Sequence, residues 1–144
     1  MSTRVVQSEH DAVVRASANT YSSKLAAGCR VSINPGCEHN FHLGPESNPR
    51  YPDVVVWRPT FPGANGGTVE VIEEIETAES VTETEADQWA DYGTLFLGVF
   101  YLIVPRGSER QAASIIRRKR ARVSQIWTYV TFGGNVTFES TNLL

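Results

Sequence analysis

The hydrophobic positions of this chain follow two different periods, and the change between the two marks the expected elements. From Val14 to Leu25, apolar residues recur at helical spacing, which predicts a first helix over residues 9–27 that ends at Gly28. Shorter segments follow, rich in β-branched residues and bounded by Pro, Gly and Asn. They predict three strands, over residues 30–34, 51–58 and 68–77.

Capping-box patterns predict two more helices in the second half of the chain. Thr82 with Glu85 begins one helix, and Ser108 with Gln111 begins another whose buried side extends to Val123. An apolar run between these helices predicts a strand over residues 99–104, and two β-type segments around Gly133-Gly134-Asn135 predict a terminal hairpin. The element order therefore predicts an α/β fold, a mixed central sheet flanked by helices.

Length and composition fit a single domain over residues 1–144. A chain of this size buries roughly two-thirds of its unfolded surface around one core, and 41% of its residues are hydrophobic and 20% charged. No apolar run reaches the roughly 18 residues of a membrane span, so we expect no membrane partner. The polar N-terminal segment lacks a signal-like apolar stretch, so a cytoplasmic location is the default expectation.

Charge is unevenly distributed, although the net charge is only −3. Acidic residues concentrate between Glu70 and Asp91, and basic residues between Arg106 and Arg122. A basic cluster late in the chain is either a solvated helix face or a contact for nucleic-acid phosphates. Its members are Arg117, Arg118, Lys119, Arg120 and Arg122.

Carboxylates fall on two neighbouring strands of the expected sheet. Alternation along the 68–77 strand places Glu74 and Glu76 on one face and Glu73 on the other. Asp53, on the preceding strand, can then lie beside Glu74. Such hard oxygen ligands suit Mg²⁺, which in turn can activate water and neutralise charge on a phosphodiester. The pattern thus indicates nuclease chemistry.

The motif Pro52-Asp53, followed by Glu74-Ile75-Glu76, resembles the signature of the PD-(D/E)xK nuclease superfamily. The expected order of helix, three strands, helix and strand over about residues 9–105 resembles the core of that superfamily. Gln88 and Tyr92 also match the Q-x3-Y pattern of its recombination-repair branch. The resemblance implies a restriction-endonuclease-like αβββαβ core, here followed by a C-terminal helix and a hairpin.

The resemblance further implies an Mg²⁺-dependent or Mn²⁺-dependent nuclease that hydrolyses phosphodiester bonds in DNA. Asp53 and Glu74 would hold the metal. Glu76, at the position where the family usually has lysine, would activate water or act as a third metal ligand. Gln88 and Tyr92 would orient the site, the basic cluster would contact the DNA backbone, and the protein would work as a homodimer.

Other interpretations stay open at the level of sequence. Because Glu76 replaces the usual lysine, the fold can instead be a degenerate nuclease kept as a binding or regulatory module. A zinc site on Cys29, Cys37, His39 and His42 is disfavoured, because their spacing departs from the usual paired ligands. The other acidic residues have two expected roles. Glu9 is either an additional acid of the site or a residue that interacts with the helix dipole. A solvated rim is expected for Glu70, Glu73, Glu79 and Glu83.

Overall fold

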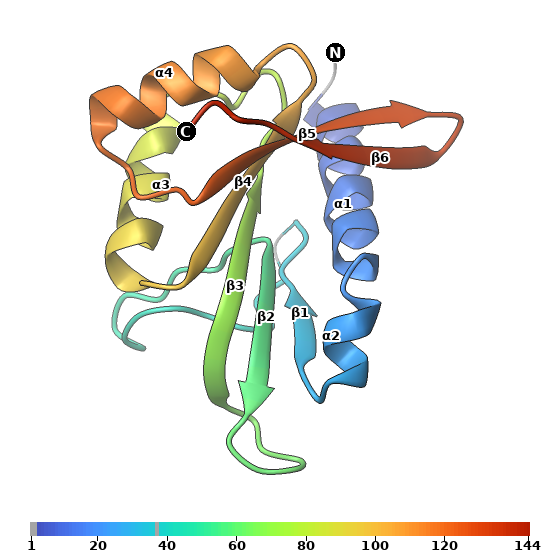
Figure 1. The fold of residues 1–144 in the computed structure, drawn as a ribbon, viewed down its shortest axis with the longest axis vertical. Coiled ribbons are helices and arrows are strands. Elements are labelled where there is room, and N and C mark those ends of the chain that lie inside the picture. Colours follow the sequence, from blue (N-terminus) through green and yellow to red (C-terminus); the bar gives the residue numbers. More distant parts are fainter. Residues whose placement is uncertain (1–2, 37) are drawn as a thin grey trace.

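The computed structural model, which describes residues 3–36 and 38–144, is an α/β fold built on one curled, mixed sheet (Figure 1). Six strands follow one another in chain order across the sheet: β1 (Arg30–Ile33), β2 (Val54–Pro59), β3 (Gly67–Ile75), β4 (Val99–Pro105), β5 (Gln125–Phe132) and β6 (Asn135–Ser140). The pairings β1–β2, β2–β3 and β5–β6 are antiparallel, whereas β3–β4 and β4–β5 are parallel. The predicted α/β class, mixed sheet and terminal hairpin are confirmed.

Helices cover both faces of this sheet (Figure 1). Their bounds are α1 (Thr3–Asn19), α2 (Ser22–Ala26), α3 (Glu83–Leu95) and α4 (Glu109–Lys119). On one face, α1 places Val13 and Val14 against Val54 and Ile75. On the other, α3 and α4 enclose a larger cluster that includes Trp89, Phe100, Leu102, Ile116 and Ile126. No helix in the described segments is long and apolar enough to cross a membrane.

The first helix differs from its prediction, because the expected 9–27 segment is divided between α1 and α2. At the break, both the backbone N–H and the hydroxyl of Thr20 donate to the Ser17 carbonyl, at 3.0 and 2.7 Å. A threonine hydroxyl that competes for backbone groups in this way favours the end of a helix. Leu25, expected on the buried stripe, is 50% exposed on the short α2.

The last helix also ends earlier than its apolar pattern predicts. Arg120 adopts a left-handed conformation with φ 52°, and the Ala121 N–H donates to the Ile116 carbonyl at 3.1 Å. This bond closes the helix end in the manner of a Schellman motif. Val123 therefore packs against the α3–α4 core from the loop after the helix. Ser108 makes no capping hydrogen bond; instead, the Glu109 carboxylate accepts from the Gly107 N–H.

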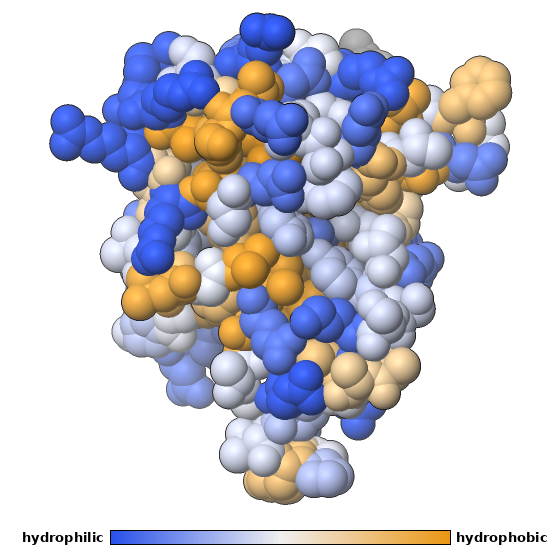
Figure 2. All heavy atoms as spheres, viewed as in Figure 1, coloured by the Kyte–Doolittle hydropathy of each residue, from blue (hydrophilic) through white to orange (hydrophobic). Residues whose placement is uncertain are grey.

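On the face shown in Figure 2, apolar groups lie in patches bordered by hydrophilic side chains. The most exposed large apolar residues are Phe61 and Leu97, which lie in loops, and Phe132, which ends β5. Among the described residues, in contrast, the interior contains four acidic side chains, each residue less than 10% exposed: Asp53, Glu73, Glu74 and Glu76. Buried charges are rare in folded proteins, so this group marks the part of the molecule most in need of a functional explanation.

The close approach of β2 and β3 predicts a large difference between two neighbouring glycines. A Cβ atom added at Gly67 would lie 1.9 Å from the Arg58 carbonyl oxygen, whereas one at Gly66 would meet nothing within 4 Å. We expect Gly67→Ala to destabilise the protein by about 1–2 kcal/mol, because backbone must shift to accept the methyl group. Gly66→Ala should be neutral or slightly stabilising. Urea unfolding of the two variants checks this, and equal stabilities would contradict it.

Candidate functional site

Asp53, the residue just before β2, and Glu74 of β3 lie side by side. The antiparallel register pairs Val54 with Glu73, which brings the preceding Asp53 next to Glu74. The Asp53 backbone N–H donates to Glu74 Oε2 at 3.4 Å, and Asp53 Oδ2 accepts from the Ile75 N–H at 2.8 Å. The site thus lies where the parallel strand β3 ends, the edge at which α/β sheets usually bind ligands.

Alternation along β3 sends its carboxylates to opposite faces of the sheet, as the sequence predicts. Glu76, just after β3, accepts at Oε1 from the Trp89 Nε1–H of α3 at 2.8 Å. Glu73 accepts from the hydroxyls of Ser17 and Tyr21 on the α1 side. The expectation that Glu73 belongs to a solvated rim is wrong, since its side chain is enclosed beneath α1 and only 3% of the residue is exposed.

Burial makes the charged forms of these carboxylates costly. Asp53, Glu74 and Glu76 are 7%, 8% and 3% exposed. Desolvation raises the pKa of Glu74 well above its ordinary value, and the negative charges of Asp53 and Glu76 add to that rise. Desolvation also raises the pKa of Glu76, to about 7, although hydrogen bonds from Ser80 and Trp89 oppose it. A cation near the cluster would relieve this repulsion.

His10 of α1 is such a cation, and the sequence analysis missed it. Its Nε2 lies 3.2 Å from Asp53 Oδ2, and its Nδ1 lies 3.2 Å from Asp11 Oδ1. Burial alone would lower the pKa of His10, but the hydrogen bonds and charges of Asp53 and Asp11 raise it to about 9. The available signal was helical spacing: His10 precedes Val13 and Ser17 by three and seven positions, on the sheet-facing stripe.

The pairing of His10 with Asp53 predicts a pH-dependent contribution to stability. Because the folded pKa of about 9 exceeds the ordinary 6.5, the contribution is complete below about pH 6.5 and is lost as pH rises through 9. Relative to His10→Gln, the wild type should be about 1–2 kcal/mol more stable at pH 6.5 and lose that advantage by pH 10. Urea unfolding at both pH values measures the difference. The exposed His42→Gln variant is the control, and a pH-independent His10 effect would contradict the assignment.

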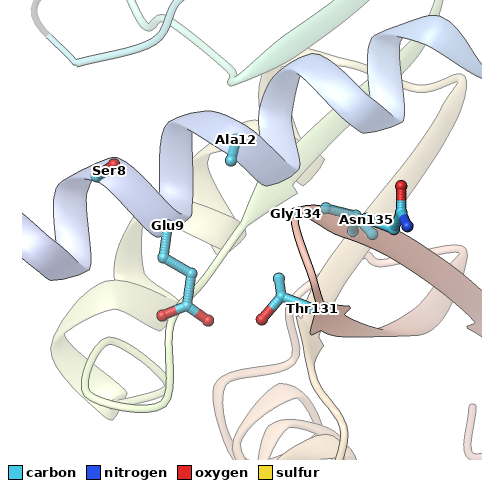
Figure 3. Close-up of a pocket in the computed structure, with 7 residues that line it drawn as sticks. Ser8, Glu9, Ala12, Thr131, Gly134 and Asn135 are labelled. Carbon is cyan, nitrogen blue, oxygen red and sulfur yellow. The ribbon is translucent and has the colours of Figure 1, made fainter.

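Glu9 lies next to His10 in sequence but faces a different part of the molecule. It lines a cavity of about 480 Å³ between α1 and the β5–β6 hairpin. In Figure 3 its carboxylate extends from the helix toward Thr131, with Gly134 and Asn135 beyond. Of the two neighbours on α1, therefore, His10 and not Glu9 contacts Asp53.

Tyr92 of α3 lies close enough to the carboxylates to be affected by their charge, and Gln88 lies beside it. Gln88 Nε2 donates to the Tyr92 hydroxyl at 2.8 Å. Tyr92 is fully buried, and desolvation followed by the charge of Glu74 raises its pKa. Gln88 also lines a surface hollow of about 510 Å³, whose rim includes Arg50 and Tyr51. Tyr92 of the predicted pair is thus placed near the carboxylates, and Gln88 lies at the surface hollow.

The basic cluster lies at the end of α4, and several of its members have partners within the chain. Arg118 pairs with Glu83 at 2.7 Å and Lys119 with Asp87 at 3.0 Å, both acids of α3. Arg117 donates to the Leu143 carbonyl. Arg120 and Arg122 are exposed. The charges that are segregated in sequence therefore partly neutralise one another where α3 packs on α4, and such exposed pairs are weak enough to exchange for phosphate.

The three predicted ligands differ in how freely their oxygens could bind a divalent metal. Across residues 3–36 and 38–144, no group of three or more His, Cys, Asp or Glu side chains is placed to hold a metal ion. Both Glu76 oxygens instead accept hydrogen bonds, from Trp89 and from Ser80. Asp53 Oδ1 and Glu74 Oε1 accept none from the residues that the structure describes. A donor set of two carboxylates remains, and Mg²⁺ commonly binds through one or two.

The predicted zinc alternative gains no support from the placement of its residues. Cys29 is buried, with its thiol 3.5 Å from Glu70 Oε2. His39 stacks on Tyr51 at 3.8 Å between ring centroids. Cys37 lies outside the described residues. The described members of the quartet are thus engaged with other groups.

Comparisons with protein-family models, curated proteins and solved structures find nothing that matches this chain. Support for a function therefore comes from the side chains around Asp53 and Glu74 and from the order of the elements. These features are chemical and geometric, and each can be tested by substitution.

Proposed function

We propose that this protein is an Mg²⁺-dependent or Mn²⁺-dependent nuclease that hydrolyses phosphodiester bonds in DNA. One observation carries the proposal: Asp53 and Glu74 lie side by side at the end of β3, nearly buried, and each has an oxygen that no described hydrogen bond engages. His10 offsets the charge of Asp53 only in part, through Oδ2, so the negative charge of the pair still favours binding a further cation.

In this proposal Asp53 and Glu74 would hold the metal. A bound divalent ion would polarise a phosphoryl oxygen and lower the pKa of coordinated water. Glu76 is the general base, because a carboxylate whose pKa is about 7 accepts and releases a proton near neutral pH. Trp89 and Ser80 fix the orientation of that carboxylate through their hydrogen bonds.

The surroundings of the cluster support a nucleic-acid substrate. The hollow beside Gln88 contains Arg50, which pairs with the exposed Asp91 at 3.2 Å and can exchange that partner for a phosphate. The element order of α1–α2, three strands, α3 and β4 is consistent with the αβββαβ core of restriction-endonuclease-like proteins. Because one small domain offers limited surface to a duplex, the proposal includes a homodimer as the acting form.

A second candidate is a binding or regulatory module on the same fold, without catalysis. Contacts within the protein already engage several oxygens of the site, which favours this candidate. His10 contacts Asp53 Oδ2, and Trp89 and Ser80 donate hydrogen bonds to the Glu76 carboxylate. In that case the cluster stabilises a particular packing of α1 and α3 against the sheet.

A cleavage assay distinguishes the two candidates. Single-stranded DNA, duplex DNA and RNA are incubated with the purified protein at millimolar Mg²⁺ or Mn²⁺, or with EDTA. Cleavage with metal, none with EDTA, and a rise in melting temperature on adding metal are the expected results. If the metal produces neither cleavage nor a melting shift, the nuclease proposal fails and the binding module is favoured.

A further inference from the structure

The surface hollow beside Gln88 is bordered by a flat pair of stacked rings. The His39 imidazole lies nearly parallel to the Tyr51 ring, with 3.8 Å between the ring centroids and an interplanar angle of 5°. Both residues line the hollow, which measures about 510 Å³. His39 is exposed, whereas Tyr51 is half-buried. A further flat ring can therefore extend the stack on the side of His39.

The hollow also contains groups that recognise a phosphate and the polar edge of a ring. Arg50 donates to Asp91 Oδ2 at 3.2 Å and to Asn48 Oδ1 at 2.7 Å, and these bonds position its guanidinium. A guanidinium binds phosphate through two parallel hydrogen bonds. Gln88 and Asp87 of α3, which also line the hollow, add an amide and a carboxylate. Together these groups suit the three parts of a nucleotide: the face of the base, its edge and the phosphate.

The two acids of the hollow leave room for an anion, because each is paired with a base. Asp91 pairs with Arg50 at 3.2 Å and Asp87 with Lys119 at 3.0 Å. The side chains of the first pair are partly exposed, and such surface pairs contribute little to stability. A phosphate can therefore replace Asp91 as the partner of Arg50.

The hollow adjoins the proposed metal site along two parts of the chain. Tyr51 lies two positions before Asp53. On α3, Gln88 donates to the Tyr92 hydroxyl at 2.8 Å. Desolvation, and then the charges of Glu74 and Asp53, raise the pKa of that tyrosine, so it lies within reach of both carboxylates. A nucleotide in the hollow would thus be a neighbour of a phosphodiester held at the carboxylates.

We infer that the hollow binds one unpaired nucleotide of a single-stranded DNA substrate, with its base stacked on His39 and a phosphate on Arg50. Inside a duplex, each base is covered on both faces by its neighbours. The bases of a single strand, in contrast, stack readily on aromatic side chains. The inference rests on the proposed nuclease function and specifies its substrate, because the site would then bind and cut single strands in preference to duplexes.

Binding is measured apart from cleavage, by fluorescence anisotropy in EDTA at one fixed salt concentration, with a labelled single strand of about ten nucleotides. The wild type should bind this strand about tenfold more tightly than a blunt duplex of the same length. His39→Ala should weaken single-strand binding about tenfold, the loss expected for one stacked base. His39→Phe, which keeps a flat ring, should bind within about threefold of the wild type.

The matched control is His42→Ala. His42 is an exposed histidine of the same loop, and it meets Tyr51 edge on, with 6.2 Å between ring centroids and an interplanar angle of 68°. It is not among the described residues that line the hollow. This variant should bind the single strand as the wild type does.

The possible outcomes separate this inference from the proposed function. Single-strand binding that depends on His39, without cleavage in Mg²⁺ or Mn²⁺, would support the hollow as a DNA site while the nuclease proposal fails. Metal-dependent cleavage of both DNA forms at equal rates, with His39→Ala as active as the wild type, would keep the nuclease and overturn the inference. It is overturned as well if the wild type binds no single strand, or if a folded His39→Ala protein, judged by its melting curve, binds as the wild type does.

Discussion

Replacement of Asp53 by asparagine is expected to reduce metal-dependent DNA cleavage by at least about 100-fold, which corresponds to about 2.7 kcal/mol of transition-state stabilisation. The substitution preserves shape, and the asparagine oxygen can still accept the Ile75 N–H that Asp53 Oδ2 accepts at 2.8 Å. What it removes is the negative charge that would hold the metal beside Glu74 in the proposed nuclease. Initial rates at saturating Mg²⁺, compared with those of the wild type, measure the loss.

The control for this prediction is Glu79→Gln. Glu79 follows β3 by a few residues and is exposed, so its substitution removes one nearby negative charge without touching the Asp53–Glu74 pair. Cleavage by the control should stay within about twofold of the wild type. An Asp53→Asn protein that is folded, as judged by its melting curve, and that cleaves at the wild-type rate would exclude Asp53 as a metal ligand.

The face of the sheet on which each carboxylate of β3 lies could be predicted, because it depends on local geometry. In a strand, successive side chains alternate, so Glu73 was expected opposite to Glu74 and Glu76, and the structure confirms this. The α/β class followed for the same reason, because each element has a local periodic signal. These inferences need no information from distant parts of the chain.

The burial of Glu73 and the ion pairs of the basic cluster, in contrast, depend on contacts between distant residues. Glu73 is buried because Ser17 and Tyr21, 56 and 52 positions earlier, cover it. Arg118 pairs with Glu83 only because α4 packs on α3, 35 positions apart. Charge runs in a sequence report which side chains are ionic, but tertiary packing decides which of them meet solvent.

His10 illustrates the same limit within the site itself. Its spacing on α1 indicates a sheet-facing position, yet its contact with Asp53 spans 43 positions. Glu76 stands where the resembled family usually has a lysine, whereas the structure supplies a histidine from the first helix. The cation of the site thus comes from an element outside the recognised motif.

Replacement of Glu76 by glutamine should stabilise the metal-free protein at pH 8 by up to about 3 kcal/mol. Burial raises the folded pKa of Glu76 from 4.5 to about 7. Between these values the folded state binds the proton more tightly than the unfolded state, so the stability of the wild type falls as pH rises from 4.5 to 7 and stays reduced above it. Glutamine carries no charge, so the variant does not lose stability as the pH rises. Its side-chain oxygen can still accept from Trp89 Nε1, and its amide can donate to the Ser80 hydroxyl.

Urea unfolding in EDTA at pH 4.5 and pH 8 measures the effect, with the exposed Glu46→Gln as control. The variant and the wild type should differ little at pH 4.5 and most at pH 8, whereas the control should match the wild type at both. A Glu76→Gln protein that is less stable at pH 8 would show that the buried charge contributes favourably, against the expectation. In the proposed nuclease the same variant also lacks its general base, so it should gain stability and lose cleavage together. That combination is expected of a group retained for chemistry at a cost in stability.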